Sequence, residues 1–180
     1  KILKKIIDPT LKAVGEMGEK YVGFLYAGLM IKNNEPFLIE YNVRMGDPEC
    51  QTILPLIDND LVEIIDACCN SNLEHYEIKW KNKKSMCIVL CSKGYPEKYN
   101  KNIEIKNLNE SESSEKNYIF HAGTKLVNDK VLAIGGRVLN FVNLSDNFSS
   151  GRKEIINEIK KINWEGGFYR SDIGYKVINE

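Results

Sequence analysis

The sequence is 180 residues long, and its 25 Lys and Arg residues balance its 25 Asp and Glu residues. A chain of this length suffices for one domain, or for two small ones, with a buried core. The zero net charge does not favour a nucleic-acid-binding surface, and no apolar run approaches the roughly 20 residues that span a bilayer. The Lys-rich start lacks the apolar segment of a signal peptide, so we expect a cytoplasmic protein without nucleic-acid or membrane partners.

Two further features concern the chain as a whole. Its five cysteines are spaced neither as a disulfide framework nor as a zinc site, so we expect buried, reduced thiols. The sequence begins with Lys1 rather than Met, inside an amphipathic pattern, and it contains no Gly-rich phosphate loop. We therefore expect it to be part of a larger protein.

The first elements are predicted to be helical and then a hairpin. Apolar residues recur at helical spacing over residues 1–17, which predicts one helix or two with a buried face, ended by Gly18. Residues 21–32 and 37–44 are rich in β-forming side chains, and the Asn-Asn-Glu-Pro sequence at residues 33–36 is typical of a turn. Together these segments predict an antiparallel hairpin.

The second arm of this hairpin alternates apolar and polar side chains. Because successive side chains of a strand point to opposite faces, Glu40, Asn42 and Arg44 share one face. The opposite face is predicted to be a core face, formed by Phe37, Ile39, Tyr41 and Val43. Residues two apart on one face lie about 7 Å apart, so Glu40 and Asn42 can reach a common ion. Their hard oxygens are ligands that Mg²⁺ takes together with water and phosphates. The alternative is an antiparallel strand with one face in water.

Two helices are predicted after this strand. Asp47, which follows Gly46, is placed to cap a helix whose first residue is Pro48. A helix N-terminus attracts anions, but Asp47 and Glu49 are themselves anions, and a plain capped helix explains the pattern equally well. Asp60 is predicted to cap a second helix ending near Asn70, with Leu61, Ile64, Ile65 and Cys68 on one face.

The second half of the chain is predicted to be α+β. Polar residues 72–84 connect to it, an apolar strand occupies residues 85–91, and the polar run 107–117 predicts a mobile surface loop. Four short strands follow at residues 118–121, 124–127, 131–134 and 138–142, and then a helix at residues 148–162. The aromatic residues near the end are expected to pack back on the body as an ordered tail.

Two loops of this half carry candidate binding residues. His121 lies at a strand end in the sequence His-Ala-Gly-Thr, where a structural role is the alternative to a chemical one. Arg137 follows Gly135 and Gly136, and glycines permit the close backbone approach that ligand loops use. The alternative for Arg137 is an exposed position in a hairpin turn.

Six segments together closely resemble the C-terminal part of the phosphoribosylamine–glycine ligase family, also called glycinamide ribonucleotide synthetases: GFLYAGLMI, FLIEYNVRMGDPECQ, GYP, FHAGTK, GGRVL and FYRSDIGYK. They cover nearly the whole chain in order, and residues 107–117 are the least similar. The family belongs to the ATP-grasp superfamily and uses ATP to join glycine to 5-phosphoribosylamine in purine synthesis. The resemblance implies that residues 1–78 end an ATP-grasp core, an antiparallel sheet with helices, and that residues 79–180 form a small α+β domain.

The resemblance also implies roles for the matching residues. Glu40 and Asn42 correspond to ligands of a Mg²⁺ or Mn²⁺ ion that bridges to the phosphates of ATP. Arg44 would be the catalytic residue, facing the same phosphates and the acyl-phosphate transition state. The implied substrate-binding residues are Gly46, Asp47 and Glu49 beside the glycine or the amine, and His121, Gly123, Thr124, Gly135, Gly136 and Arg137 in the two later loops.

The chain departs from the family pattern in two respects. Many ATP-grasp enzymes have another acidic metal ligand on the preceding strand, where this chain has Tyr26, Ala27 and Gly28. The family's N-terminal substrate domain and nucleotide lid correspond to segments upstream of Lys1, so we expect the chain to work with those domains as partners. The alternatives are another ATP-grasp carboxylate–amine ligase or a carboxylase, or a binding or scaffold module without turnover.

Overall fold

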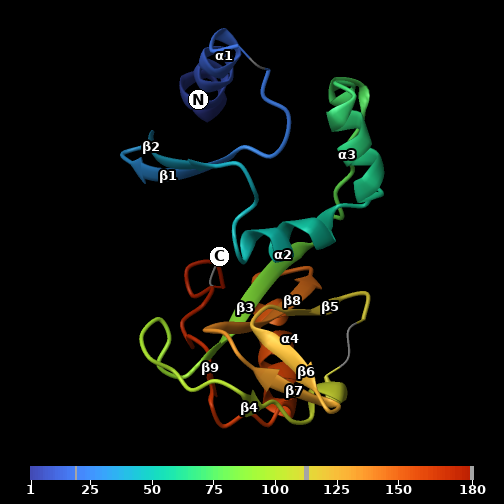
Figure 1. The fold of residues 1–180 in the computed structure, drawn as a ribbon. Helices are drawn as coiled ribbons and strands as arrows, with labels where there is room; N and C mark the ends of the chain where they lie inside the picture. The colour runs from blue at the N-terminus through green and yellow to red at the C-terminus, as the bar shows by residue number, and fades with distance from the viewer. Residues whose placement is uncertain (19, 112–113, 179–180) are drawn as a thin grey trace. The chain divides into compact units, whose positions relative to one another are not determined.

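The computed structural model describes residues 1–18, 20–111 and 114–178. The chain divides into two compact units. The first consists of Lys1–Cys50 and Ile57–Lys79, and the second of Gln51–Leu56 and Trp80–Glu180. Every strand pairing in the described ranges is antiparallel, and helices accompany the sheets, so the fold is α+β as predicted (Figure 1).

The first unit begins with a helix and a hairpin, as expected. A π-helical segment, η1 (Leu3–Ile7), continues directly into α1 (Asp8–Glu16). Pro9 lies in the first turn of α1, and because η1 runs directly into α1, its missing N–H removes one hydrogen bond from a continuous helical segment. The hairpin consists of β1 (Tyr26–Lys32) and β2 (Glu35–Asn42), and Asn33 and Asn34 turn the chain with φ values of 52° and 59°. The turn is therefore shorter than predicted, because residues 35 and 36 already belong to β2.

The prediction of a core face on β2 is wrong. Phe37, Ile39 and Val43 are 55%, 64% and 71% exposed, and only Tyr41 of that set is half-buried. Tyr41 is covered because its hydroxyl meets Thr10 and donates to the carbonyl of Ile6 at 3.2 Å. A hairpin of two strands has little core of its own. Here the helical segment η1–α1 contacts this face at Tyr41, and most of the remaining side chains of the face are exposed. A register shift between Gly28 and Leu29 also interrupts the regular alternation.

The helices after the hairpin follow the predicted order with two corrections. They are α2 (Glu49–Ile53), η2 (Leu54–Leu56), α3 (Leu61–Cys69) and η3 (Leu73–His75). Asp60 caps α3 as predicted, since its carboxylate accepts a hydrogen bond from Val62 N at 2.7 Å. Pro48 precedes α2 instead of opening it. Ile64 and Ala67 are the buried residues of α3, whereas Ile65, which was expected on that face, is exposed.

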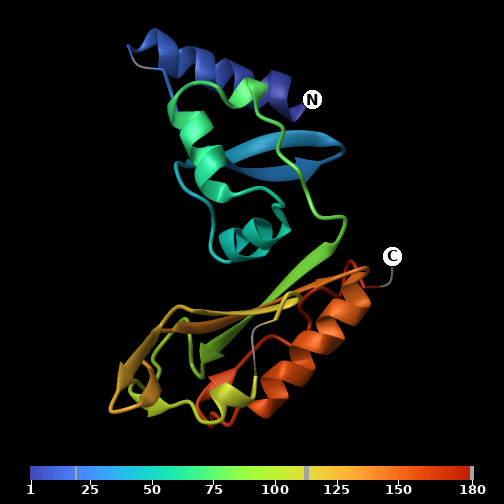
Figure 2. The same ribbon diagram turned by 90° about the vertical axis from the view of Figure 1, so that its right-hand side faces the viewer.

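The second unit contains two antiparallel sheets and one long helix. The four-stranded sheet has the order β5-β8-β3-β9 and the three-stranded sheet the order β4-β7-β6. The strands are β3 (Lys84–Ser92), β4 (Ile103–Glu104), β5 (Asn117–His121), β6 (Thr124–Val127), β7 (Lys130–Ala133), β8 (Arg137–Ser145) and β9 (Gly167–Phe168). The helix α4 (Phe148–Lys161) runs along the four-stranded sheet (Figure 2). The strands and helix predicted here are confirmed to within a few residues.

The core of the second unit lies between the four-stranded sheet and α4. Ile88 and Phe141 are paired across β3 and β8, and they pack with Ile155 of α4. All seven residues of β8 from Val138 to Leu144 are buried, so both faces of this strand are covered. The tail packs back on the same body, since Arg152 donates to the carbonyls of Ser171 and Ile173.

The polar run 107–117 is not simply a surface loop. It contains a 3₁₀ turn, η4 (Leu108–Glu110), and Ser111 is 5% exposed, with its hydroxyl donating to Glu158 Oε2 at 2.7 Å. The expectation of an exposed loop is therefore wrong at Ser111, while residues 112–113 lie outside the described ranges. The described part of the chain contains no disulfide and no helix with the length and hydropathy needed to cross a membrane.

Candidate functional site

The polar face of β2 holds Glu40 and Asn42 side by side. Asn42 Nδ2 donates to Glu40 Oε1 at 3.0 Å, so the two head groups lie on one face within reach of each other. Gly28 of β1 pairs with Glu40, and a Cβ at Gly28 would lie 3.0 Å from Glu40 Cγ. The absence of a side chain at Gly28 therefore lets the Glu40 side chain lie across the neighbouring strand.

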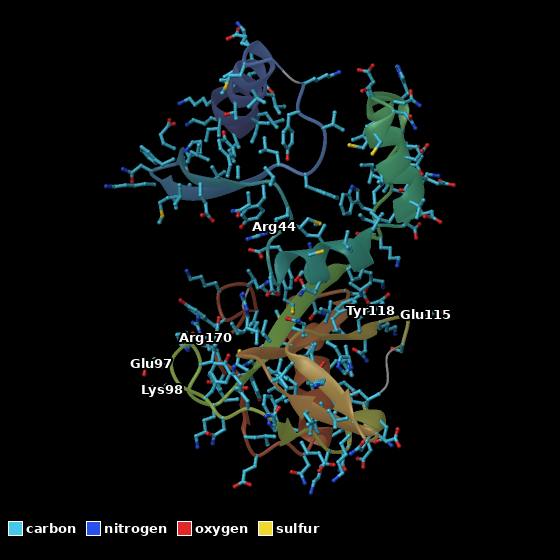
Figure 3. The ribbon with its side chains drawn as sticks, viewed as in Figure 1. Arg44, Glu97, Lys98, Glu115, Tyr118 and Arg170 are labelled. Carbon is cyan, nitrogen blue, oxygen red and sulfur yellow. The ribbon has the colours of Figure 1, made fainter. Side chains whose placement is uncertain are left out.

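Arg44 lies two residues after the end of β2. Its side chain is exposed, and Nη1 donates to the carbonyl of Met45 at 3.1 Å (Figure 3). This hydrogen bond uses one of the five N–H groups of a guanidinium, and that planar group is suited to phosphate. The position is compatible with the predicted role beside Glu40 and Asn42.

Glu49 is linked to the same hairpin through Tyr26 of β1. Its Oε1 accepts a hydrogen bond from the Tyr26 hydroxyl at 3.2 Å, and a Cβ at Gly46 would come within 2.2 Å of its Oε2. The hydrogen bond to Glu49 raises the pKa of Tyr26, the negative charges of Glu49 and Glu40 add to this effect, and Arg44 opposes it. Tyr26 is thus near enough to Glu40, Arg44 and Glu49 to respond to all three charges. The sequence does not predict this role of Tyr26, because a tyrosine where related enzymes have an acidic metal ligand carries no signal of a contact with Glu49.

The predicted anion site at the N-terminus of the next helix is not supported. The helix α2 has only five residues, and its first residue is the acidic Glu49. Asp47 lies in the exposed turn before it, and Gly46 is buried beneath the Glu49 carboxylate. A five-residue helix that opens on a carboxylate does not favour anion binding at this turn.

The donor set fits a hard cation. Glu40 and Asn42 supply carboxylate and amide oxygens, which are the ligands that Mg²⁺ and Mn²⁺ take in proteins. Within residues 1–18, 20–111 and 114–178, no three His, Cys, Asp or Glu side chains are grouped in a way that would hold a metal ion. A cation bound here would therefore complete its coordination with water and with phosphate oxygens, as Mg²⁺ commonly does.

In the second unit, the two predicted loops lie against each other. Gly123 N donates to Arg137 O at 3.0 Å, and Ile134 N and Gly135 N both donate to Gly123 O. A Cβ at Gly123 would lie 2.6 Å from both Arg137 O and Gly135 Cα, so the contact requires glycine. His121 Nδ1 lies 2.9 Å from Thr124 Oγ1, which agrees with the structural alternative for this histidine.

A third loop joins these two. A Cβ at Gly136 would lie 2.1 Å from Tyr95 Cδ2, and Ser92 holds both glycines through Gly136 O (2.8 Å from its N) and Gly135 O (2.7 Å from its Oγ). In the sequence, the Gly135–Gly136 pair indicates that another group approaches the backbone closely, but it does not indicate that this group is Tyr95. Tyr95 was missed because a contact across about 40 residues leaves no periodic pattern.

The predicted site residues thus form two groups. Glu40, Asn42, Arg44, Gly46, Asp47 and Glu49 belong to the first unit. His121, Gly123, Thr124, Gly135, Gly136 and Arg137 belong to the second unit. The structure brings Glu40 together with Asn42 and Glu49 together with Tyr26 in the first group, and it brings the Gly123 and Gly135–Gly136 loops together in the other.

Comparison with known proteins gives concordant matches over most of the chain. Residues 85–176 match the family model "Phosphoribosylglycinamide synthetase, C domain", and residues 1–50 match "Phosphoribosylglycinamide synthetase, ATP-grasp (A) domain". The phosphoribosylamine–glycine ligase of Caldanaerobacter subterraneus is 41% identical over 96% of this chain, and that of Fusobacterium nucleatum is 40% identical over 97%. The chain spans only 40% and 41% of those two relatives.

A solved structure is also similar. The phosphoribosylamine–glycine ligase of Thermotoga maritima superposes with a TM-score of 0.81 and 30% sequence identity. The match covers 94% of this chain and 41% of that protein. The arrangement described above is therefore similar to that of the corresponding part of a longer protein.

Proposed function

The chain belongs to the phosphoribosylglycinamide synthetase family, and from that membership we propose that it forms part of a phosphoribosylamine–glycine ligase. The reaction joins glycine to 5-phosphoribosylamine and converts ATP to ADP and phosphate. The Glu40–Asn42 pair on β2 carries this proposal, because it lies inside the segment that matches the ATP-grasp domain and presents two hard oxygens on one face.

The chemistry explains why such a face is needed. A carboxylate oxygen of glycine attacks the γ-phosphorus of ATP, ADP leaves, and glycyl phosphate forms. The nitrogen of 5-phosphoribosylamine then attacks the activated carbonyl carbon, and phosphate leaves while the nitrogen loses a proton. In the first step two anions approach each other, so positive charge at the site lowers the barrier.

Three residues of the β2 segment supply or hold that charge. Glu40 and Asn42 would hold Mg²⁺ or Mn²⁺, which when bound offsets the charge of the phosphates. Arg44 faces the same phosphates with its guanidinium, which can bind two oxygens at once. Glu49, fixed by Tyr26 and Gly46, borders the same cluster and would orient the glycine or the amine together with Asp47.

The second unit would supply the substrate side. The adjoining loops at His121, Gly123 and Thr124 and at Gly135, Gly136 and Arg137 offer backbone groups, a hydroxyl and a guanidinium at one end of the four-stranded sheet. We propose that residues 1–78 are the end of an ATP-grasp core and residues 79–180 a C-terminal domain. The separate family matches at residues 1–50 and 85–176 support this division.

Reconstitution tests the proposal. Since the chain spans about two-fifths of its relatives, we expect the purified chain alone to make no glycinamide ribonucleotide. Addition of the upstream part of a phosphoribosylamine–glycine ligase, as a fusion or in trans, should give ADP release that depends on both glycine and 5-phosphoribosylamine.

Two results would contradict the proposal. Turnover by the chain alone would show that the upstream domains are not needed. ADP release from the reconstituted protein only with another carboxylate or another amine would identify a different ATP-grasp ligase or a carboxylase.

A further inference from the structure

A basic groove lies on the loop that follows β3. One cavity of about 570 Å³ is lined by Lys93, Glu97, Lys98, Tyr99, Asn100 and Lys101. A second cavity, of about 350 Å³, is lined by Lys93, Asn100, Ile103, Glu165 and Gly166. The two cavities share Lys93 and Asn100, so they adjoin, and together they are called the lysine groove below.

The backbone around the lysine groove is held in a defined shape. Gly94 has a φ of 102°, and a Cβ there would lie 2.2 Å from Lys98 O, so only glycine fits this turn. Lys93 N donates to Gly166 O at 2.7 Å, which ties the start of the loop to the tail segment that forms the second cavity. The groove is therefore built from two segments that are more than 60 residues apart in sequence.

The groove offers hydrogen-bond donors with positive charge. Lys93, Lys98 and Lys101 are among the residues that line it, and Lys101 Nζ lies 6.0 Å from the centre of the Tyr99 ring. Figure 3 shows the side chains of Glu97 and Lys98 projecting from this loop. Glu97 and Glu165 are the acidic residues of the lining, so positive charge is in excess.

A buried donor lies behind the second cavity. Trp164 is 8% exposed, and its Nε1 has no hydrogen-bond partner among the described residues. A Cβ at Gly166 would come within 3.0 Å of this nitrogen, so the indole N–H lies directly behind a residue that lines the groove. Buried donors without a partner are uncommon in proteins and call for an acceptor.

The lysine groove adjoins the substrate loops of the second unit. The same loop carries Tyr95, whose ring packs on Gly136, the residue next to Arg137. The loop that lines the groove is therefore also in contact with one of the candidate substrate loops.

We propose that the lysine groove binds the phosphate group of a phosphorylated sugar, the amine substrate of the proposed reaction. A phosphate monoester carries nearly two negative charges and three acceptor oxygens, which complement the charge of the three lysines in the lining. Asn100, shared by both cavities, supplies an amide for sugar hydroxyl groups. The choice of a sugar phosphate over a nucleotide phosphate rests on the proposed function. The binding of a phosphate monoester rests only on the residues that line the groove.

Direct titration of the chain tests the binding site. Ribose 5-phosphate, ribose, inorganic phosphate and AMP are titrated into the ¹⁵N-labelled chain, and amide shifts of residues 93–101 and 165–167 are followed. The expected result is saturable binding of ribose 5-phosphate at these residues, with no shifts from ribose. Equal or tighter binding of AMP there would overturn the assignment to a sugar phosphate. Shifts from inorganic phosphate that are equal to those from ribose 5-phosphate would indicate an adventitious ion only.

Paired variants supply the control. The double variant Lys98→Met, Lys101→Met keeps the length of the side chains and removes two charges, so the dissociation constant for ribose 5-phosphate should rise about tenfold or more. Lys153→Met on the exposed face of α4 should leave it unchanged. Unchanged binding in the double variant, with an unchanged melting temperature, would overturn the proposal.

Steady-state kinetics of the complete ligase that carries this chain distinguishes a failure of the proposed function from a failure of the proposed phosphate site. The double variant should raise the KM for 5-phosphoribosylamine and leave the KM values for ATP and glycine unchanged. If the reconstituted protein shows no ligation at all, the proposed function fails, while the ribose 5-phosphate titration still decides whether the groove binds a phosphorylated sugar. An equal rise in all three KM values would overturn the assignment of the groove to the amine substrate.

Discussion

The carboxylate of Glu49 lies between the Gly46 backbone and the Tyr26 hydroxyl, and this small arrangement orders the polar cluster of the first unit. Tyr26 donates to Glu49 from the strand beside β2, so an acidic group of the turn is held at the hairpin that carries Glu40. A hydrogen bond to an ionised partner is stronger than a neutral one. Tyr26 therefore acts as a positioning residue for Glu49.

Titration of Tyr26 reports this contact. The pKa of Tyr26 is raised above 10.0, chiefly by its hydrogen bond to Glu49. The contribution of this bond to stability is therefore fully present below pH 10.0 and is lost as the pH rises through the raised pKa. Glu49→Gln should lower the pKa of Tyr26, as measured by the ring carbon shifts in NMR. Glu63→Gln is the matched control, because Glu63 raises the pKa of Tyr76 through the same kind of bond. A Tyr26 titration that Glu49→Gln leaves unchanged would show that the contact does not form.

At the scale of elements, the hairpin depends on the helix beside it. Lys1 and Lys5 each reach Glu35 at the start of β2, and Tyr41 near its end bonds to the carbonyl of Ile6. An isolated hairpin of two strands is marginally stable, so these contacts fix β2 against the helical segment. The contacts of Glu35 and Tyr41 with the helical segment therefore fix the position of β2, and with it the face that carries Glu40 and Asn42.

The anchoring ion pair should be visible in a pH titration. Hydrogen bonds from Lys1 and then Lys5 lower the pKa of Glu35 from 4.5 to about 2. Because the folded pKa is the lower one, the stabilisation is present above pH 4.5 and is lost as the pH falls toward about 2. Lys5→Met should raise the pKa of Glu35 in a carboxyl-carbon NMR titration. Lys12→Met, on the same helical segment, should leave it where it is. An identical Glu35 titration in both variants would exclude the anchoring role of Lys5.

The three loops of the second unit depend on close backbone packing. A Cβ at Gly136 would lie 2.1 Å from Tyr95 Cδ2, so Gly136→Ala should reduce the free energy of unfolding by about 1–3 kcal/mol through overpacking. Gly15→Ala is the control, because no atom lies within 4 Å of its new Cβ and alanine favours the helix by up to about 1 kcal/mol. Urea denaturation compares the two. Equal stability of both variants would mean that the Tyr95–Gly136 contact is not tight.

Local patterns predicted most of these elements, and tertiary contacts account for the rest. The Asn33–Asn34 turn and the Asp60 cap follow from the preferences of single residues, so the sequence predicted them. The strands β4 and β9 have two residues each, which is too short for any periodic signal. The exposure of Phe37 was not predictable, because alternation indicates which residues share a face but not what covers it.

The candidate site was predictable to a similar extent. The spacing of Glu40 and Asn42 placed both on one face, and the structure confirms that their head groups meet. Their metal-binding role stays a prediction. The contact of Tyr26 with Glu49 joins residues 23 positions apart, and that of Tyr95 with Gly136 joins two distant loops, so neither could be inferred from local pattern.

At the scale of the whole molecule, the two units differ in how much of their apolar surface is buried. The second unit has a core between α4 and a strand, β8, that is buried on both faces. The hairpin of the first unit exposes Phe37, Ile39 and Met30, and the chain spans about two-fifths of its relatives. We therefore expect the polar face of β2 to act in the complete ligase, where the ATP phosphates would contribute further oxygen ligands.

The most direct measurement is the rate of ligation by the complete ligase as a function of Mg²⁺ concentration, for Glu40→Gln, Asn42→Leu and the double variant. If the two side chains hold one ion, each single variant should lose on the order of 10- to 100-fold in rate at low Mg²⁺. The double variant should lose less than the product of the two, because the residues act as a unit. Glu16→Gln, on the exposed end of α1, should keep the full rate, and all melting temperatures should stay close together. Near-normal rates for both single variants at low Mg²⁺ would contradict the account, since Glu40 and Asn42 would then be only the solvent-facing side of a strand.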